Sequence, residues 1–200
     1  MTMPSKKIHL VVEGPGDKEA VPLLVRRILL AHDLHHVQLT TPQVSGGIQT
    51  ARKRFVDYWP YALMNECPIL WVLDCEDSCV VAEAKTFEQT LNALARHDAQ
   101  PTKFAFFHSE METLFLAEEK ALRSFYALKP EIQIPPQAIS RRNAKGEISN
   151  LLPANRGYKE TTDQAKIAAR LDLGRCREIS RDFRHLEKAV LTLVNGPKTI

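Results

Sequence analysis

Short apolar segments alternate with longer amphipathic segments along this chain. The run Ile8–Glu13 is apolar and β-branched, and Gly14-Pro15-Gly16 ends it abruptly, so it predicts a buried strand. Apolar positions then recur at near-helical spacing from Ala20 to Ala31, and Asp17 is a suitable N-cap for that helix. The first thirty residues therefore predict a strand, a tight turn and a helix.

The same alternation continues through the middle of the chain. A second strand is expected over 37–44, followed by a helix over 48–64 that Pro60 interrupts or ends. The clearest strand is Pro68–Leu73, a continuous apolar run of the kind that is buried on both faces of a parallel sheet. This strand leads directly into Asp74.

The remaining elements follow from the same periodicities. The segment 129–159 is rich in Pro, Asn and Arg, which favours a long irregular connection. We expect a helix over 80–97, a strand over 103–108, a helical stretch over 110–119 and closing helices over 162–170 and 183–194.

Strands that alternate with helices indicate right-handed crossovers and therefore a mainly parallel sheet with helices on both faces. The predicted fold is α/β, with about four strands in a doubly wound, Rossmann-like arrangement. With 200 residues, 44% of them hydrophobic and 26% charged, the chain has the composition of one ordinary domain. We expect a single domain over 1–200, divided into an α/β core (1–128), the irregular segment (129–159) and a helical closing segment (160–200).

Bulk properties argue against a membrane protein. The longest apolar runs, such as Ile69–Leu73, are far shorter than the roughly 20 residues of a membrane-spanning helix. The first residues lack a secretory pattern, and four cysteines do not indicate a disulfide scaffold, so a cytoplasmic location is expected. The net charge of +3 is too small to indicate nucleic-acid binding by itself.

Acidic side chains follow three of the four predicted strands. In parallel α/β sheets, ligands bind beyond the carboxyl ends of the strands, so these side chains are expected to meet there. Gathered carboxylates repel one another unless a cation or protons neutralise them, and Mg²⁺ (or Mn²⁺) is a hard cation that prefers oxygen ligands. The candidate acidic residues are Glu13, Asp74, Glu76, Asp77, Glu110 and Glu112.

Two other interpretations apply to parts of this pattern. Asp and Glu favour helix N-termini, so capping is the alternative for Asp17 and Asp77, and it explains Glu13 and Asp74 less well because each follows an apolar strand. The segment Glu13–Asp17 has the glycines of a phosphate loop, but it lacks the Lys-Ser/Thr ending of the Walker pattern. We therefore exclude a nucleotide-triphosphate loop.

Two motifs resemble the Toprim fold, which primases, topoisomerases and overcoming-lysogenization-defect nucleases share. The first is a strand that ends in Glu13-Gly14, and the second is a strand followed by Asp74-Cys75-Glu76 in place of Asp-x-Asp. More narrowly, the chain resembles the Toprim-like domain of unknown function family 4276 over nearly its whole length. Glu110–Ala117 is similar to that family's Glu-x-Glu-Ala-Trp-Leu-Leu-Ala element, and the segments around Lys159 and Ser180–Phe183 are similar to its closing segment.

The resemblance implies roles for individual residues. Glu13 would be the general acid/base, Asp74 and Glu76 would hold magnesium, and Glu112 would join the site. The sequence departs from the pattern in two places, because Glu76 replaces the second Asp of the Toprim pair and Leu114 replaces the Trp of the Glu-x-Glu element. Asp77 and Glu110 are further candidate metal ligands.

Two hypotheses for function follow from this resemblance. The first is a Mg²⁺-dependent phosphodiester-cleaving enzyme that acts on DNA or RNA, in which Lys159 or Arg142 neutralises phosphate charge, although either can equally be a surface cation. The second is a non-catalytic binding or regulatory module that keeps the Toprim scaffold and works with an ATPase partner.

Overall fold

The computed structural model describes residues 7–76, 78–94, 100–134 and 142–195. The strands of its sheet are β1 (Lys7–Val12), β2 (Gln38–Leu39), β3 (Gln43–Val44), β4 (Ile69–Cys75) and β5 (Thr102–His108). The helices are α1 (Asp17–Ala31), α2 (Ile48–Lys53), the 3-10 helix η1 (Phe55–Tyr58), α3 (Trp59–Met64), α4 (Val80–Asn92), α5 (Glu112–Ala117), α6 (Glu119–Tyr126), α7 (Ala144–Asn150), α8 (Glu160–Ala168), α9 (Leu173–Ile179) and α10 (Arg181–Asn195).

The sheet is parallel, with the strand order β2-β1-β4-β5, and β3 also pairs with β1. From β1 the chain passes to one side to form β2 and β3, and it then crosses to the other side of β1 to form β4 and β5. The order therefore reverses between β1 and β4, which is where ligands bind in open α/β sheets. This arrangement confirms the predicted α/β fold class.

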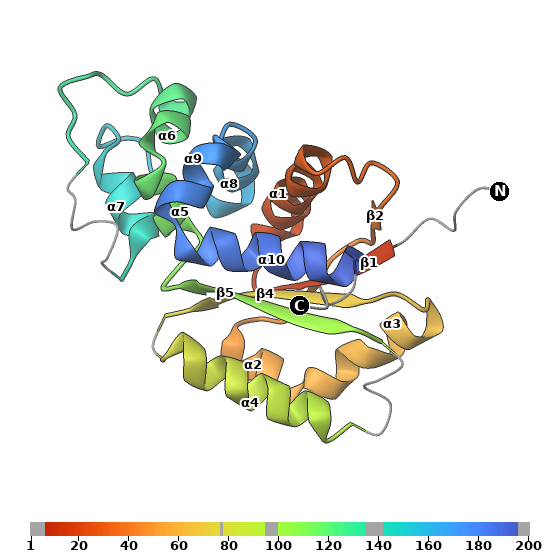
Figure 1. Cartoon of the computed structure of the whole chain (residues 1–200). Helices are drawn as coiled ribbons and strands as arrows, with labels where there is room; N and C mark the ends of the chain where they lie inside the picture. Colours follow the sequence, from red (N-terminus) through yellow and green to blue (C-terminus); the bar gives the residue numbers. More distant parts are fainter. Residues whose placement is uncertain (1–6, 77, 95–99, 135–141, 196–200) are drawn as a thin grey trace.

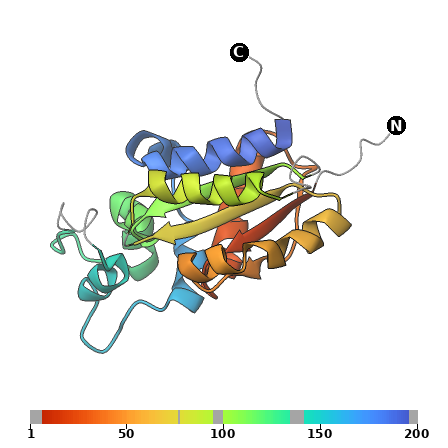
Figure 2. The same cartoon turned by 90° about the horizontal axis from the view of Figure 1, so that it is seen from below.

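Helices cover both faces of the sheet (Figures 1 and 2). Helices α1 and α10 lie on one face, and α2, α3 and α4 lie on the other. All seven residues of β4 are buried, and their side chains alternate between the faces: Leu70 and Val72 join the core beneath α1 and α10, whereas Trp71 joins the opposite core. The second core is aromatic, since the rings of Phe55 and Trp71 stack with centroids 4.9 Å apart.

Shorter helices gather beyond the ends of β4 and β5. Helices α5, α6 and α7 lie at the edge of the sheet where these strands finish, and α8 packs beside α1 (Figure 1). None of the helices in the described part of the chain is long and apolar enough to cross a membrane. These short helices place polar side chains from late in the sequence over the carboxyl ends of the strands.

Several predicted elements have different boundaries in the structure. The strand expected over 37–44 is two separate two-residue strands, β2 and β3, because Pro42 lacks the N–H that a continuous ladder needs. The helix expected over 48–64 is divided at Arg54, and Pro60 lies in the first turn of α3, where a missing N–H costs nothing. The segment expected to be irregular, 129–159, contains α7.

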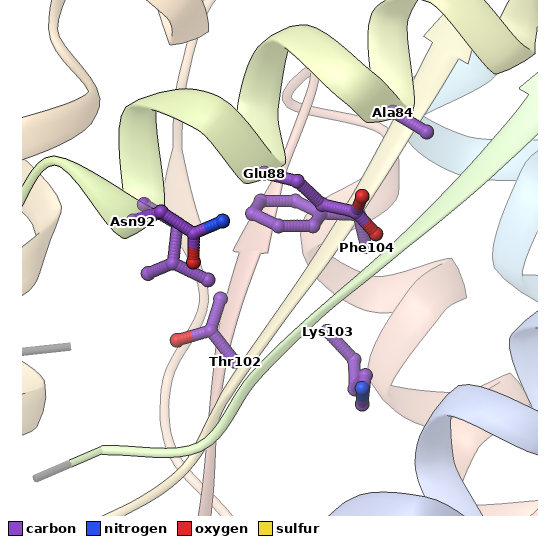
Figure 3. Close-up of a pocket in the computed structure, with 7 residues that line it drawn as sticks. Ala84, Glu88, Asn92, Thr102, Lys103 and Phe104 are labelled. Atoms are coloured by element: carbon purple, nitrogen blue, oxygen red, sulfur yellow. The ribbon is translucent and has the colours of Figure 1, made fainter. Parts of the chain in front are cut away.

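A pocket of about 270 Å³ lies between α4 and the beginning of β5 (Figure 3). Its walls include Glu88 and Asn92 of α4 and Thr102, Lys103 and Phe104 of β5. The amino end of a parallel strand is opposite to its carboxyl end, so this pocket is at the other edge of the sheet from the acidic residues.

Candidate functional site

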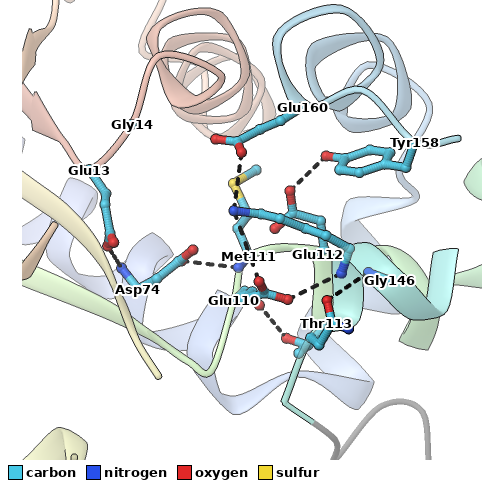
Figure 4. A network of polar contacts seen from close by, with 12 residues as sticks. Glu13, Gly14, Asp74, Glu110, Met111, Glu112, Thr113, Gly146, Tyr158 and Glu160 are labelled. Carbon is cyan, nitrogen blue, oxygen red and sulfur yellow. Dashed lines mark hydrogen bonds and ion pairs between the residues drawn. The ribbon is translucent and has the colours of Figure 1, made fainter. Parts of the chain in front are cut away.

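Glu13 and Asp74 meet at the point where the strand order reverses (Figure 4). Glu13 directly follows β1, and Asp74 lies near the end of the adjacent β4. The backbone N–H of Asp74 donates to Glu13 Oε2 at 2.6 Å, and Asp74 Oδ1 accepts from the backbone N–H of Met111 at 3.0 Å. The Glu13 carboxylate is thus bonded to the backbone of β4, and the Asp74 carboxylate is bonded to the segment that begins α5.

Glu110 and Glu112 extend this acidic group. Glu112 is the first residue of α5 and is fully buried, and its Oε1 accepts from the hydroxyl of Tyr158 at 2.7 Å. Its other oxygen, Oε2, is buried without a hydrogen-bond partner in the described residues. Glu110 is also buried, and its Oε2 accepts from the backbone N–H of Lys145 at 3.1 Å.

Burial dominates the electrostatics of these carboxylates. Loss of hydration raises the pKa of Glu13 to about 7, although its hydrogen bond from Asp74 opposes the change. Desolvation also raises the pKa of Glu112 to about 7. The pKa of Asp74 lies well above its usual range, first because Asp74 is buried and then because Glu112, Asp17 and Glu13 repel its charge. The site therefore holds more carboxyl groups than it can ionise together without a compensating cation.

Lys145 is the cation with the largest effect on this group. Its Nζ lies 3.2 Å from Glu160 Oε2 and 4.0 Å from Glu110 Oε1. Its charge lowers the pKa of Glu13, Asp74 and Glu112 against the larger effect of burial. Lys145 comes from the first turn of α7, a helix that the sequence analysis did not predict.

The loop after β1 is fixed by contacts with α8. The side chain of Asp17 accepts from the backbone N–H of Gly14 at 2.9 Å and from Gln164 Nε2 at 2.9 Å. Asp17 is therefore not the N-cap of α1, as the sequence suggested: Gly16 occupies that position, and the Asp17 carboxylate turns back to the loop. These contacts hold the backbone that carries Glu13.

Side chains of α8 approach Gly16 so closely that the structure leaves no room for a Cβ atom at this position. A Cβ at Gly16 would lie 2.3 Å from Glu160 Cγ and 2.6 Å from Gln164 Oε1, which is closer than atoms pack. Gly16→Ala is expected to push α8 away and to lower the free energy of unfolding by about 1–3 kcal/mol. Urea unfolding measures the effect, and Gly157→Ala is the matched control because a Cβ there would meet no atom closer than 4.0 Å. Equal stability of the two variants would contradict the close packing.

The structure brings some of the predicted site residues together and separates others. Glu13, Asp74, Glu110 and Glu112 form one network (Figure 4). Glu76 is exposed just after β4, where its charge still raises the pKa of Glu13, and Asp77 lies outside the described residues.

The two predicted cationic residues are both exposed. The backbone N–H of Lys159 donates to Asp163 at the start of α8, and Arg142 lies just before α7. The structure thus places Lys145, and not Lys159, against the carboxylates.

Lys145, Tyr158 and Gln164 were missed by the sequence analysis. Lys145 and Tyr158 lie in the segment that was expected to be irregular, and nothing in the local pattern distinguishes Lys145 from other lysines. Tyr158 adjoins Lys159 within the family-like closing segment, which was the one available signal.

The donor set fits a hard divalent cation. The acidic side chains offer carboxylate oxygens, and their hydrogen bonds leave Glu13 Oε1, Asp74 Oδ2 and the buried Glu112 Oε2 without a partner in the described residues. Among the described residues, no group of three or more His, Cys, Asp or Glu side chains is already arranged around one point for a metal. Mg²⁺ commonly uses only one or two protein carboxylates and completes its shell with water and substrate.

Two of the solved structures that are similar to this chain come from OLD proteins. The C-terminal region of the Burkholderia pseudomallei OLD protein is 14% identical, with a TM-score of 0.42 and coverage of 96% of this chain and 98% of that chain. The corresponding region from Xanthomonas campestris pv. campestris is 12% identical, with a TM-score of 0.39 and coverage of 92% and 95%. No curated protein matches this chain.

One family model, described as Domain of unknown function (DUF4276), matches residues 12–191. The match spans Glu13, both acidic elements and the closing helices, so it covers every residue of the network. It also confirms the family resemblance that the acidic motifs and the closing segment indicated. The chain belongs to the DUF4276 family.

Proposed function

We propose that this protein is a metal-dependent enzyme that cleaves phosphodiester bonds in nucleic acid. The observation that carries the proposal is the meeting of Glu13 and Asp74 at the reversal of strand order, with Glu112 buried beside them. Each buried charge without a compensating partner destabilises the fold. Several buried acids beside a single lysine are therefore better explained by a function than by a contribution to stability. The resemblance of both motifs to Toprim enzymes supports the same reaction class.

The proposed roles follow the resemblance to the Toprim motifs, and the burial and contacts of Glu13, Asp74 and Glu112 support them. Asp74 and Glu76, with Glu112, would hold Mg²⁺ or Mn²⁺, and Asp77 and Glu110 are further candidates. When bound, such an ion would polarise the scissile phosphate and stabilise the leaving oxygen. Glu13 has a pKa near 7, which suits a residue that accepts and returns a proton at neutral pH, and its Oε1 is the oxygen available for this step.

The exposed cations extend the proposed substrate contact. Lys159 and Arg142 both lie on segments adjacent to α7 and α8, the helices that carry Lys145 and Glu160. Long basic side chains at such a rim contact phosphates without reading sequence. We therefore assign Arg142 to contact with the nucleic-acid backbone, and Lys159 to a catalytic role in which it neutralises the charge of the scissile phosphate.

A cleavage assay tests the proposal. Purified protein is incubated with labelled single- and double-stranded DNA and RNA in EDTA, Mg²⁺ or Mn²⁺, and products are resolved on a denaturing gel. Cleavage is expected only with metal, and Glu13→Gln is expected to abolish it. Glu178→Gln is the matched control because this glutamate is exposed and far along α9, where it pairs with Arg175. The absence of metal-dependent cleavage of every substrate, with Glu13→Gln behaving like the wild type, would refute the proposal.

A further inference from the structure

Lys145 places its positive charge beside the buried carboxylates. Its ammonium group lies 3.2 Å from Glu160 and 4.0 Å from Glu110, and its charge acts on Glu13, Asp74 and Glu112 as well. The backbone N–H of Lys145 is itself anchored to Glu110. The position of its Cα is therefore fixed, while the four-carbon side chain can place Nζ at different carboxylates.

The carboxylates that attract Lys145 differ in burial. Glu112 and Asp74 are buried at the bottom of the group, whereas the side chain of Glu160 is 31% exposed at its rim. Glu160 is held over the loop after β1, where its Oε1 lies 3.1 Å from the position of a Cβ on Gly14. The charge of Lys145 can thus be neutralised by Glu160 alone, while its ammonium group stays away from Asp74 and Glu112.

We propose that Lys145 is an internal counter-ion that competes with the divalent metal for the buried carboxylates. When the metal binds, the ammonium group of Lys145 stays paired with Glu160. This inference rests on the proposed function, because it assumes a metal at Asp74. Two positive charges near the same carboxylates repel each other, so each lowers the affinity of the other. Lys145 thereby keeps the metal-free protein folded and makes metal binding weaker and more readily reversible.

Lys145→Met removes the charge and keeps much of the apolar side chain. At pH 8 the metal-free variant is expected to unfold at a lower temperature than the wild type, because the carboxylates lose their cation. Titration calorimetry is expected to show that it binds Mn²⁺ about tenfold more tightly, which corresponds to about 1.4 kcal/mol. Lys166→Met is the matched control, since Lys166 is an exposed lysine on α8, and it should match the wild type in both measurements.

The outcomes separate this inference from the proposed function. If the wild type and Lys145→Met both fail to bind Mn²⁺, the proposed function and the inference fall together. If both bind it with the same affinity, or the variant binds it more weakly, the metal site stands and Lys145 is not a competing counter-ion. A metal-free Lys145→Met with wild-type thermal stability would also overturn the inference.

A second measurement covers the case in which Lys145→Met does not fold. Lysines of the wild type are labelled by reductive ¹³C-methylation, and the Lys145 signal is assigned by its absence in Lys145→Arg, which keeps the charge. Addition of Mg²⁺ is expected to shift the Lys145 signal and to leave the Lys166 signal unchanged. Saturation with Mg²⁺ without movement of the Lys145 signal would overturn the inference.

Discussion

Asp74→Asn is expected to abolish metal binding and to lower the rate of metal-dependent cleavage by roughly a thousandfold, which corresponds to about 4 kcal/mol of transition-state stabilisation. The reason is that Asp74 is the buried carboxylate at the centre of the network, linked to both Glu13 and Met111. An amide carries no charge, so it cannot replace a carboxylate toward a hard cation. Calorimetry with Mn²⁺ and the cleavage assay measure the two effects.

The same substitution is expected to preserve or increase the stability of the metal-free protein. Asn retains an oxygen that accepts from the N–H of Met111, and it removes a carboxyl group whose pKa burial raises well above its usual range. Thermal unfolding in EDTA at pH 8 therefore distinguishes a lost site from a lost fold. Wild-type metal affinity in Asp74→Asn, or cleavage within a fewfold of the wild type, would exclude Asp74 as a metal ligand.

Metal also has to compete with protons at Asp74. Because the pKa of this carboxyl is raised, metal binding at lower pH must release a proton, so the apparent affinity for Mn²⁺ is expected to fall as pH decreases. The same calorimetric titrations, repeated at pH 6 and pH 8, detect this change. The released protons appear as a dependence of the measured heat on the ionisation enthalpy of the buffer.

The second large effect is a loss of stability of the metal-free protein as pH rises from about 4.5 to above 7. Glu13 has a pKa of about 7 in the folded protein and 4.5 as its ordinary value, so the native state keeps a proton that the unfolded chain releases. The stabilisation from this proton is complete below about pH 4.5 and is lost as pH rises through 7. For Glu13 alone, the free energy of unfolding is expected to fall by roughly 3 kcal/mol over this pH range.

Glu13→Gln isolates this contribution. The variant has no proton to lose, and its side-chain carbonyl can still accept from the N–H of Asp74, so in EDTA at pH 8 it should be more stable than the wild type. At pH 5 the two should unfold at more similar urea concentrations. Urea unfolding at pH 5, 6.5 and 8 tests this expectation, and a constant difference between the two proteins across the range would contradict it.

Other groups contribute to the pH dependence with different signs. Burial lowers the pKa of His9, so the folded protein binds the proton of His9 less well than the unfolded chain does. The contribution of His9 to the free energy of unfolding therefore increases as pH rises toward 6.5, which opposes the effect of Glu13 in that range. Asp17 and Glu112 act in the same direction as Glu13, because burial raises the pKa of both. The comparison of wild type with Glu13→Gln cancels these common contributions. Addition of Mn²⁺ at pH 8 should recover the lost stability of the wild type, since the metal replaces the missing protons.

The sequence by itself predicted the α/β class and the position of Glu13 and Asp74 at one edge of the sheet. This was possible because local signals are strong there: the strands are short and apolar, the glycines end β1 sharply, and parallel strands must finish at the same edge. The pairing of β1 with β4, which places Glu13 beside Asp74, is known only from the structure. The family motifs then indicated Glu112 as a partner of these two residues.

The sequence was less informative about short elements. Strands β2 and β3 contain two residues each and exist because β1 pairs with both, and α7 has too few apolar positions to show a periodicity. The division of 48–64 into α2, η1 and α3 depends on aromatic packing against Trp71, which is a contact between distant residues. Such elements are stabilised by tertiary packing more than by intrinsic propensity.

Only the tertiary structure decided which cation faces the carboxylates. The sequence offered Lys159 and Arg142, but α7 places Lys145 beside Glu110 and Glu160, and Tyr158 reaches Glu112 from the following segment. The raised pKa values of Glu13 and Asp74 likewise depend on burial by helices from the C-terminal third of the chain. Burial and long-range charge are properties of the packed molecule, so the acidic residues and their expected roles could be predicted from the sequence, whereas the shifts of their pKa values and the position of Lys145 could not.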